Sequence, residues 1–258
     1  MSGVGVFRVV IPARYASTRL PGKALLPLAG KPMIQWVYER TGGCGAKEVI
    51  IATDDERIAK PARAFGAAVA MTAATHASGT DRIAEVASQR GWAENDIVVN
   101  VQGDEPLMPP ALIGQVAGLL HDAPSAGIAT LATPLRSTEE LLNPNIVKVV
   151  ADVAGRALYF SRAPIPWNRD GAVGDLQSQR SYEEARRHIG IYAYRVGSLL
   201  RLASLPAARL ENLEKLEQLR ALANGIEIRV ADAVMLPGPD VNTQADVAGV
   251  ERQLLSGG

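Results

Sequence analysis

The fold is indicated first by residues 7–23, FRVVIPARYASTRLPGK, in which a short apolar run leads directly into a polar loop. The run from Phe7 to Ile11 is rich in β-branched residues and ends at Pro12, which is typical of a buried β-strand. Val49 to Ala52 and Ile97 to Val101 are similar runs. Near-continuous apolar strands of this kind fit a parallel sheet that is covered on both faces.

Amphipathic segments alternate with these strands. The glycines Gly66 and Gly91 follow two of the segments as expected helix stops. The alternation predicts an α/β fold with an open, doubly wound, mainly parallel sheet. The expected helices are Pro32 to Thr41, Glu56 to Phe65, Thr80 to Arg90, Pro109 to Leu120, Leu210 to Asn224 and Gln244 to Leu255. Further strands are expected at 127–133 and 227–230.

The pattern changes between Asn143 and Tyr194. Strand-like runs at 146–150, 157–160 and 189–195 flank a polar stretch from Asp170 to Arg187. We expect one domain over residues 1–258, with an inserted arm at about 143–195.

Composition excludes several classes of protein. The chain has 258 residues, 27 basic and 27 acidic side chains and a formal net charge of +0, so bulk charge favours neither a nucleic-acid nor a membrane partner. Cys44 is the single cysteine, which excludes an internal disulfide and a cysteine-based zinc site. No apolar stretch approaches the roughly 20 residues of a membrane span, and Met1 to Gly5 do not resemble a signal peptide. We therefore expect a cytoplasmic protein.

The loop after the first strand carries three cations, Arg14, Arg19 and Lys23. Such a loop lies at the carboxyl edge of the sheet, where ligands bind. Arginine grips phosphate oxygens through paired donors and lysine adds a point charge, so the loop predicts a triphosphate site. The alternative is a solvated surface loop with scattered charges.

A second polar segment, residues 100–106 (NVQGDEP), follows a buried strand. Asp104 lies at the ligand edge, and Mg²⁺ prefers one or two carboxylates together with phosphate oxygens. Glu105 points elsewhere if the chain remains extended. The alternative is a turn-forming aspartate before Pro106.

Three further groups of polar residues are candidates with ordinary structural alternatives. Residues 75–82 (THASGTDR) offer short polar groups that could read a base edge, or simply cap a helix through Ser78 or Thr80. Glu211, Glu214 and Gln218 share one side of an expected helix, which is usually solvated surface. Each residue of a third group could equally be structural: Arg162, His188 and Tyr192.

Taken together, these segments carry a resemblance that none carries alone. Residues 10–23 and 100–106 resemble motifs of the 3-deoxy-manno-octulosonate cytidylyltransferase (CMP-Kdo synthetase) family. The same holds for residues 76–82, 159–162 (YFSR), 188–192 (HIGIY) and 213–220 (LEKLEQLR). The resemblance extends from Phe7 to about Val250.

This resemblance implies a nucleotide-diphospho-sugar transferase-like fold, a homodimer formed through the arm, and Mg²⁺-dependent transfer of CMP from CTP to 3-deoxy-D-manno-octulosonate (Kdo) for lipopolysaccharide synthesis. The implied catalytic residues are Arg14, Lys23 and Asp104. The implied nucleotide-binding residues are Ala13, Arg14, Ser17, Arg19, Lys23, Thr75, His76, Ser78, Gly79, Thr80 and Gln102. The implied sugar-binding residues are Gln102, Arg162, His188, Tyr192, Glu211, Glu214 and Gln218, and Asp104 is the implied metal ligand.

One position departs from the family pattern. Asn242 stands where a second metal-binding aspartate is usual, and Asp240 is two residues earlier. An amide oxygen is a weaker magnesium ligand than a carboxylate. The departure leaves open a related acceptor such as 8-amino-Kdo, a sialic acid or a methylerythritol phosphate. A non-catalytic CTP-binding protein is the alternative from another class.

Overall fold

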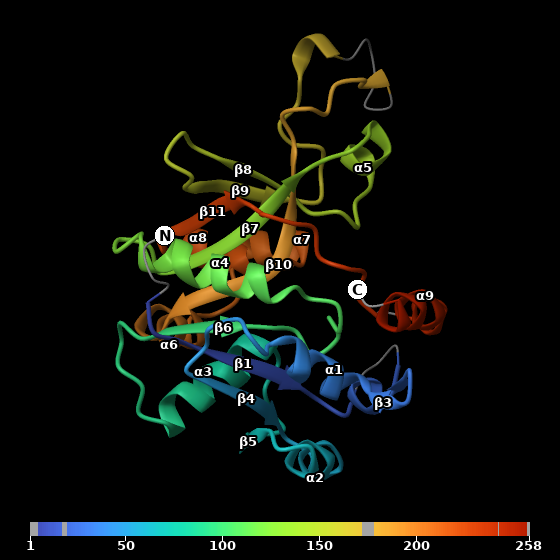
Figure 1. Cartoon of the computed structure of the whole chain (residues 1–258). Coiled ribbons are helices and arrows are strands. Elements are labelled where there is room, and N and C mark those ends of the chain that lie inside the picture. Colours follow the sequence, from blue (N-terminus) through green and yellow to red (C-terminus); the bar gives the residue numbers. More distant parts are fainter. Residues whose placement is uncertain (1–4, 17–19, 172–177, 242, 257–258) are drawn as a thin grey trace.

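The computed structural model describes residues 5–16, 20–171, 178–241 and 243–256. Its centre is a nine-stranded sheet in which seven strands follow the order β11-β7-β10-β6-β1-β4-β5 (Figure 1). Only β10 runs against the others along this path, since it is antiparallel to both β6 and β7. The open, mainly parallel sheet predicted from the sequence is confirmed.

The strands are short and mostly apolar. Within the described residues they are β1 (Phe7–Ala13), β2 (Pro27–Leu28), β3 (Lys31–Pro32), β4 (Glu48–Thr53), β5 (Ala68–Met71), β6 (Ile97–Asn100), β7 (Ile128–Pro134), β8 (Lys148–Ala151), β9 (Ala157–Ser161), β10 (Arg186–Arg195) and β11 (Ile228–Asp232).

Helices connect these strands. They are α1 (Met33–Arg40), α2 (Glu56–Ala64), α3 (Gly79–Gln89), α4 (Pro110–His121), α5 (Thr138–Leu142), α6 (Val196–Ser204), α7 (Arg209–Glu214), α8 (Gln218–Ala223) and α9 (Gln244–Leu255), with short 3₁₀ turns at Lys23–Leu25 and Arg169–Gly171. None of the helices in these ranges is long and apolar enough to cross a membrane.

Two apolar layers sandwich the sheet. Val9 of β1 packs with α1, α2 and α4 on one face, whereas Val10 packs with α3, α6 and α8 on the other. Neighbouring side chains of a strand point to opposite faces, so burial on both faces requires the unbroken apolar runs seen in the sequence. Gly66 and Gly91 end α2 and α3 with φ values of 90° and 62°, as expected of helix stops.

The prediction of a single helix from Leu210 to Asn224 is wrong. Lys215 adopts a left-handed conformation (φ 54°) that ends α7, and α8 begins at Gln218. Leu213 is 69% exposed while Leu216 and Leu219 are buried, so the leucines do not form one continuous apolar face. Glu211, Glu214 and Gln218 consequently do not share one side of a helix.

The arm region is joined to the central sheet. β8 pairs with β9 and with β10, and the described residues between β9 and β10, 162–171 and 178–185, extend away from the body at the top of Figure 1. β10 thus belongs both to the arm and to the centre of the sheet.

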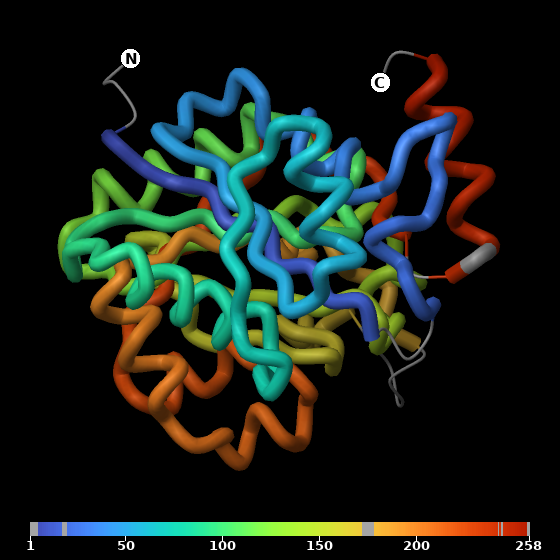
Figure 2. The backbone as a smooth tube through the Cα atoms, turned by 90° about the horizontal axis from the view of Figure 1, so that it is seen from below, coloured from blue at the N-terminus to red at the C-terminus, as the bar shows by residue number. Residues whose placement is uncertain are grey.

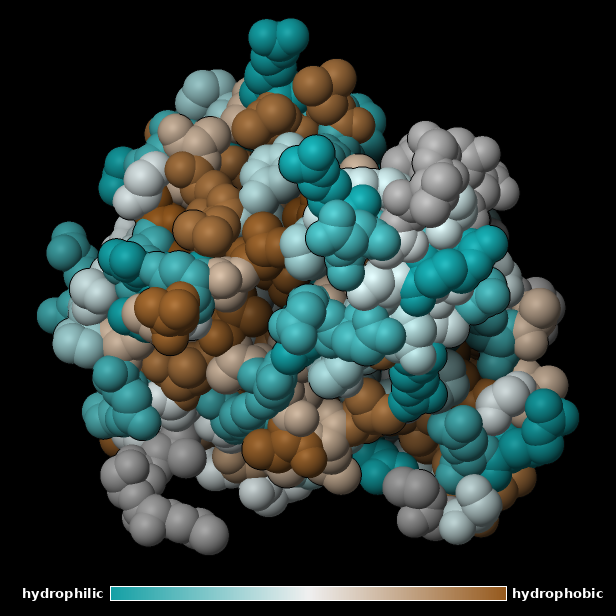
Figure 3. Space-filling model, turned by 90° about the horizontal axis from the view of Figure 1, so that it is seen from above, coloured by the Kyte–Doolittle hydropathy of each residue, from teal (hydrophilic) through white to brown (hydrophobic). Residues whose placement is uncertain are grey.

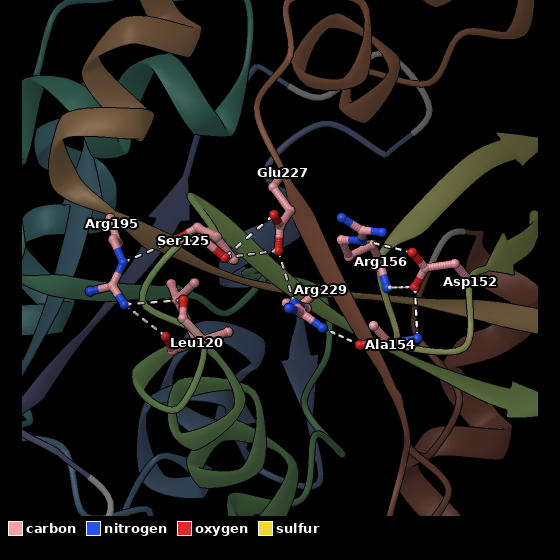
Figure 4. A network of polar contacts seen from close by, with 10 residues as sticks. Leu120, Ser125, Asp152, Ala154, Arg156, Arg195, Glu227 and Arg229 are labelled. Carbon is pink, nitrogen blue, oxygen red and sulfur yellow. Dashed lines mark hydrogen bonds and ion pairs between the residues drawn. The ribbon is translucent and has the colours of Figure 1, made fainter.

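A polar network holds the opposite, amino edge of the strands (Figure 4). Arg195 donates to the carbonyls of Ala126 (3.0 Å) and Leu120 (2.9 Å). Glu227 accepts from Ser125 and pairs with Arg229 at 2.9 Å. These contacts fix the strand starts far from the carboxyl edge, where the sequence places its polar loops.

Candidate active site

The carboxyl ends of β1 and β6 bring two polar segments together. Gly103 makes this possible, because a Cβ there would lie 2.8 Å from the Pro12 carbonyl oxygen. Only glycine permits so close an approach of the two backbones. Arg14 and Asp104 consequently line one hollow, as predicted from the position of both segments after buried strands.

We call this hollow the β1–β6 cavity; it measures about 220 Å³. Four segments line it: the start of the loop after β1, the 3₁₀ turn with α1, the start of α3 and the end of β6. The lining residues are Pro12, Ala13, Arg14, Lys23, Ala24, Met33, His76, Ala77, Ser78, Gly79, Arg82, Gln102, Gly103 and Asp104.

Lys23 and Asp104 form an ion pair in this cavity, with 2.5 Å between Nζ and Oδ2. Lys23 reaches it because Gly22 adopts φ 71° and its N–H donates to the Tyr15 carbonyl, which folds the loop back. Two further residues predicted for the triphosphate, Ser17 and Arg19, lie outside the described residues. A cation and a carboxylate at one edge can hold phosphate oxygens and a nucleotide-bound metal respectively.

The start of α3 forms another wall. Ser78 accepts a hydrogen bond from the Asp81 N–H and Asp81 accepts one from the Ser78 N–H, so the capping role of Ser78 is real. His76 contacts the Glu85 carboxylate, which contributes to lowering the pKa of Glu85. His76, Ser78 and Gly79 line the β1–β6 cavity, whereas Thr75 is not among its lining residues and Thr80 lines a second cavity.

The sequence pattern did not indicate Arg82 as a candidate site residue. Its side chain is 4% exposed, and its guanidinium lies 3.4 Å from the Asp54 carboxylate and donates to Thr72. Arg82 therefore adds a buried, anchored cation to the wall of the β1–β6 cavity. The quoted motif at residues 76–82 contains Arg82, but an arginine on an amphipathic helix is usually solvated, so the pattern did not single it out.

A second hollow, the β6–β10 cavity, measures about 280 Å³ and adjoins the first, since Gln102 lines both. Its walls come from β6, β7, β10, α3, α6 and the α7–α8 turn. The lining residues are Thr80, Asn100, Gln102, Glu105, Ile128, His188, Gly190, Tyr192, Tyr194, Leu202, Leu216, Glu217 and Gln218.

Aromatic side chains make one wall of this cavity rigid. His188 packs edge-on against Phe160 at 5.1 Å and lies 5.3 Å from Tyr192, which stacks on Tyr194. The Thr130 hydroxyl, which donates to the Ile191 carbonyl (2.7 Å), lies 3.0 Å from His188 Nε2. That hydroxyl has a single hydrogen, so Nε2 donates to it and Nδ1 is the free acceptor. Burial lowers the pKa of His188 to about 3, which keeps the ring neutral.

Two carboxyl groups line the same cavity. Burial, with Asp104 and Asp240 nearby, raises the pKa of Glu105 to about 8. Burial also raises the pKa of Glu217. Asp104 and Glu105 line different cavities, but not through the alternation of an extended strand, because the chain turns here and the Glu105 N–H donates to the Gln102 carbonyl. Glu217 lies within the quoted run at residues 213–220. The predicted straight helix gave Glu214 and Gln218 as candidates there, but not Glu217.

Three residues predicted for the sugar pocket lie behind it. Glu211 pairs with Arg220 at 2.6 Å. Glu214 accepts from the Ser161 hydroxyl and the Arg162 N–H, while the Arg162 guanidinium donates to the carbonyls of Glu214 and Pro144. Arg162, Glu211 and Glu214 are absent from the lining of both cavities, whereas His188, Tyr192 and Gln218 are present.

The segment that departs from the family pattern passes beside Asp104. The Val241 N–H donates to the Asp104 carbonyl at 3.0 Å, which anchors this segment at the site. Asp240 contributes to raising the pKa of Glu105 but lines a different hollow, with Leu236 to Pro239. Asn242 lies outside the described residues. Among those described, no group of three or more histidine, cysteine, aspartate or glutamate side chains is gathered that could hold a metal ion.

Comparison with known proteins decides the family. Residues 8–228 match the family model described as cytidylyltransferase. The 3-deoxy-manno-octulosonate cytidylyltransferase of Thioalkalivibrio sulfidiphilus is 57% identical over 248 residues, which is 96% of this chain and 98% of that protein. The protein of the same name from Cellvibrio japonicus is 59% identical, over 97% and 99% of the two chains.

The chain belongs to the 3-deoxy-manno-octulosonate cytidylyltransferase family. The family match spans every residue that lines the two cavities. A solved structure of CMP:2-keto-3-deoxy-manno-octonic acid synthetase complexed with CTP superposes with a TM-score of 0.87 at 42% identity, covering 98% of this chain and 100% of that one. The family resemblance stated from the sequence motifs is thus confirmed.

Proposed function

We propose that this protein transfers CMP from CTP to Kdo and releases pyrophosphate. The observation that carries the proposal is the pair of adjoining cavities at the carboxyl edge of β6. One is lined by Arg14, Lys23 and Asp104, and the other by polar, aromatic and carboxyl side chains. The relatives named for this activity and the CTP-bound neighbour support the same reading.

In this proposal the β1–β6 cavity holds CTP and the β6–β10 cavity holds the sugar acid. The anomeric hydroxyl of the sugar attacks the α-phosphorus and gives up its proton to water, an oxygen–phosphorus bond forms, and the bond from the α-phosphorus to the pyrophosphate oxygen breaks. Positioning and charge stabilisation dominate such chemistry. Arg14 and Lys23 stabilise the charge on the leaving pyrophosphate, and Gln102, at the junction of the cavities, orients both reactants.

We also propose that Mg²⁺ is the cofactor. The donor set fits, because a nucleotide-bound Mg²⁺ needs few protein carboxylates and Asp104 lies in the cavity wall. When bound, the ion would neutralise phosphate charge. Lys23 must leave the Asp104 carboxylate for this to occur, and the phosphates offer its ammonium a new partner.

The decisive experiment measures pyrophosphate release with CTP, Mg²⁺ and Kdo, beside 8-amino-Kdo and a sialic acid. We expect release with Kdo, its loss on adding EDTA, and its return with excess Mg²⁺. Pyrophosphate release only with 8-amino-Kdo or only with the sialic acid would show that this compound, and not Kdo, is the acceptor. No pyrophosphate release with any of the three sugar acids, together with CTP binding, would favour a non-catalytic CTP-binding protein.

Asp104→Ala tests the site directly. We expect a fall in kcat of at least about 10³-fold, because the group that faces the phosphates is removed. The Lys23–Asp104 pair is partly solvated, so its loss changes the free energy of unfolding by about 1 kcal/mol or less. Asp122→Ala, at the exposed end of α4, is the matched control and keeps full activity. Near-normal turnover by Asp104→Ala would contradict the assignment.

We propose, finally, that the protein is a homodimer. Large apolar side chains are exposed on the arm and its strands, with Leu158 62% and Trp167 40% exposed. Apolar residues gather in patches on the face of the molecule that is seen from the arm side (Figure 3). A second copy of the chain would cover such surface, as interfaces between obligate subunits do.

A further inference from the structure

The β6–β10 cavity gathers buried polar atoms that have no partner. Over the described residues, five buried side-chain atoms make no hydrogen bond, and three of them belong to residues that line this cavity. They are the Asn100 Oδ1, the Glu105 Oε2 and the Tyr192 hydroxyl. Unpaired buried polar atoms are uncommon because each has lost its water without replacement. Three in one cavity indicate that its occupant supplies the missing hydrogen bonds.

Asn100 is the least expected of the three. It ends β6 after Ile97, Val98 and Val99, and it is 2% exposed. An apolar residue would continue the buried strand and would leave no atom unpaired. A polar residue departs from the apolar pattern of a strand that is buried on both faces, and such departures concentrate at functional sites.

The position of Asn100 is fixed by its neighbours. It is the direct cross-strand partner of Tyr192 in the antiparallel β6–β10 pair, so both side chains emerge on the same face of the sheet. Tyr192 is itself held between His188 and Tyr194. Asn100 and Tyr192 therefore lie side by side on the face of the sheet that lines the β6–β10 cavity.

We infer that Asn100 is a specificity-determining residue whose carboxamide oxygen accepts a hydrogen bond from a hydroxyl of the sugar acid. The inference rests on the proposed function, in which this cavity holds the acceptor. An amide oxygen can only accept, so the group facing it must bring a hydrogen. A sugar hydroxyl does so and an ionised carboxylate does not. The hydroxylated chain of the acceptor, rather than its carboxylate, lies against Asn100.

Asn100→Leu tests the inference, because leucine has a similar volume and no polar atom. With CTP, Mg²⁺ and Kdo we expect the KM for Kdo to rise about tenfold, the effect of one lost hydrogen bond, while the KM for CTP stays within about twofold. The melting temperature should hold or rise, since an unpaired buried atom is removed. Asn100→Val, which suits a strand, gives the same readouts if leucine is not accommodated.

Asn95→Leu is the matched control, because Asn95 is exposed in the turn before β6. It should leave both KM values unchanged. A fall of several degrees in melting temperature with an unchanged KM for Kdo would overturn the inference, since Asn100 would then hold only an internal water. If the wild-type protein releases no pyrophosphate with Kdo, the proposed function fails and the inference falls with it. If the wild-type protein turns over Kdo normally and Asn100→Leu has an unchanged KM for Kdo, the inference is contradicted and the proposed function stands.

Discussion

His188 illustrates how one residue is tuned by what surrounds it. Its ring lies against Phe160 and Tyr192, and its Nε2 is bonded to Thr130, so protonation would place a charge among aromatic groups. A neutral imidazole is suited to orienting a sugar hydroxyl rather than to neutralising a carboxylate. In the proposed reaction its contribution would therefore be positional.

The same burial predicts a pH dependence. The pKa of His188 is about 3 in the folded protein and about 6.5 when unfolded, so the unfolded chain binds more protons between these values. The free energy of unfolding therefore falls as the pH falls below about 6.5. Urea unfolding at pH 7 and pH 5 should show that the wild type loses up to about 2 kcal/mol more than His188→Gln does. Equal losses in the two proteins would contradict the buried, neutral histidine.

Residue types could be predicted from the sequence more readily than burial. Arg14, Lys23 and Asp104 were recognisable because charged residues directly after buried strands lie at the ligand edge. Asn100 and Arg82 were not recognisable on their own, because their importance comes from being enclosed by segments distant in the chain. Arg162 and Glu214 show the reverse: their chemistry suits a sugar acid, yet the structure uses it to bond them to each other.

At the scale of elements, Lys148 joins three segments near the β6–β10 cavity. Its fully buried side chain donates to the carbonyls of Asn143 (2.9 Å), Ile146 (2.6 Å) and Arg162 (2.7 Å). All three ammonium hydrogens are thereby used. The bonded strand end at Arg162 in turn contacts Glu214, just before the turn that carries Glu217 and Gln218 into the cavity wall.

Lys148→Met should lower the free energy of unfolding by about 3 kcal/mol or more, because it leaves three enclosed carbonyls without a donor. Urea unfolding monitored by tryptophan fluorescence measures the change. Lys60→Met, on the exposed side of α2, serves as the control and should change stability by less than about 0.5 kcal/mol. A loss as small as that of the control would mean that these carbonyls are already satisfied by water.

Helices with a clear hydrophobic period were predicted well. The wrong prediction of a single helix at 210–224 has a local cause. The expected helix at 244–255 coincides with α9, and the expected helix at 56–65 differs from α2 by one residue. The break between α7 and α8 escaped notice because Lys215, which is neither glycine nor asparagine, occupies the left-handed region there. Tertiary bonds to Glu214 hold a turn that the local sequence does not signal.

At the scale of the whole molecule, the strand–helix alternation was sufficient to predict the sheet and its covered faces. The strand order was not accessible in the same way. The insertion of β10 between β6 and β7 depends on long-range pairing, and it is this antiparallel strand that carries His188 and Tyr192 to the cavity.

The proposed dimer makes a prediction at this scale. Light scattering on the purified protein should give twice the chain mass of 27.3 kDa. The value should persist at raised salt, since apolar burial rather than charge would hold the two copies together. A mass of one chain at micromolar concentration would contradict the dimer.

The place of α9 has a consequence for how the protein is made on the ribosome. Figure 2 shows α9 beside the hairpin of β2 and β3, more than 200 positions away in the chain. The Ala29 N–H donates to Glu251, and Leu28 and Met33 share an apolar cluster with Val250 and Leu254. The region that presents Lys23 therefore stays partly uncovered until translation has delivered the apolar side chains of α9. Nucleotide binding by a nascent chain should accordingly begin only after α9 has been synthesised.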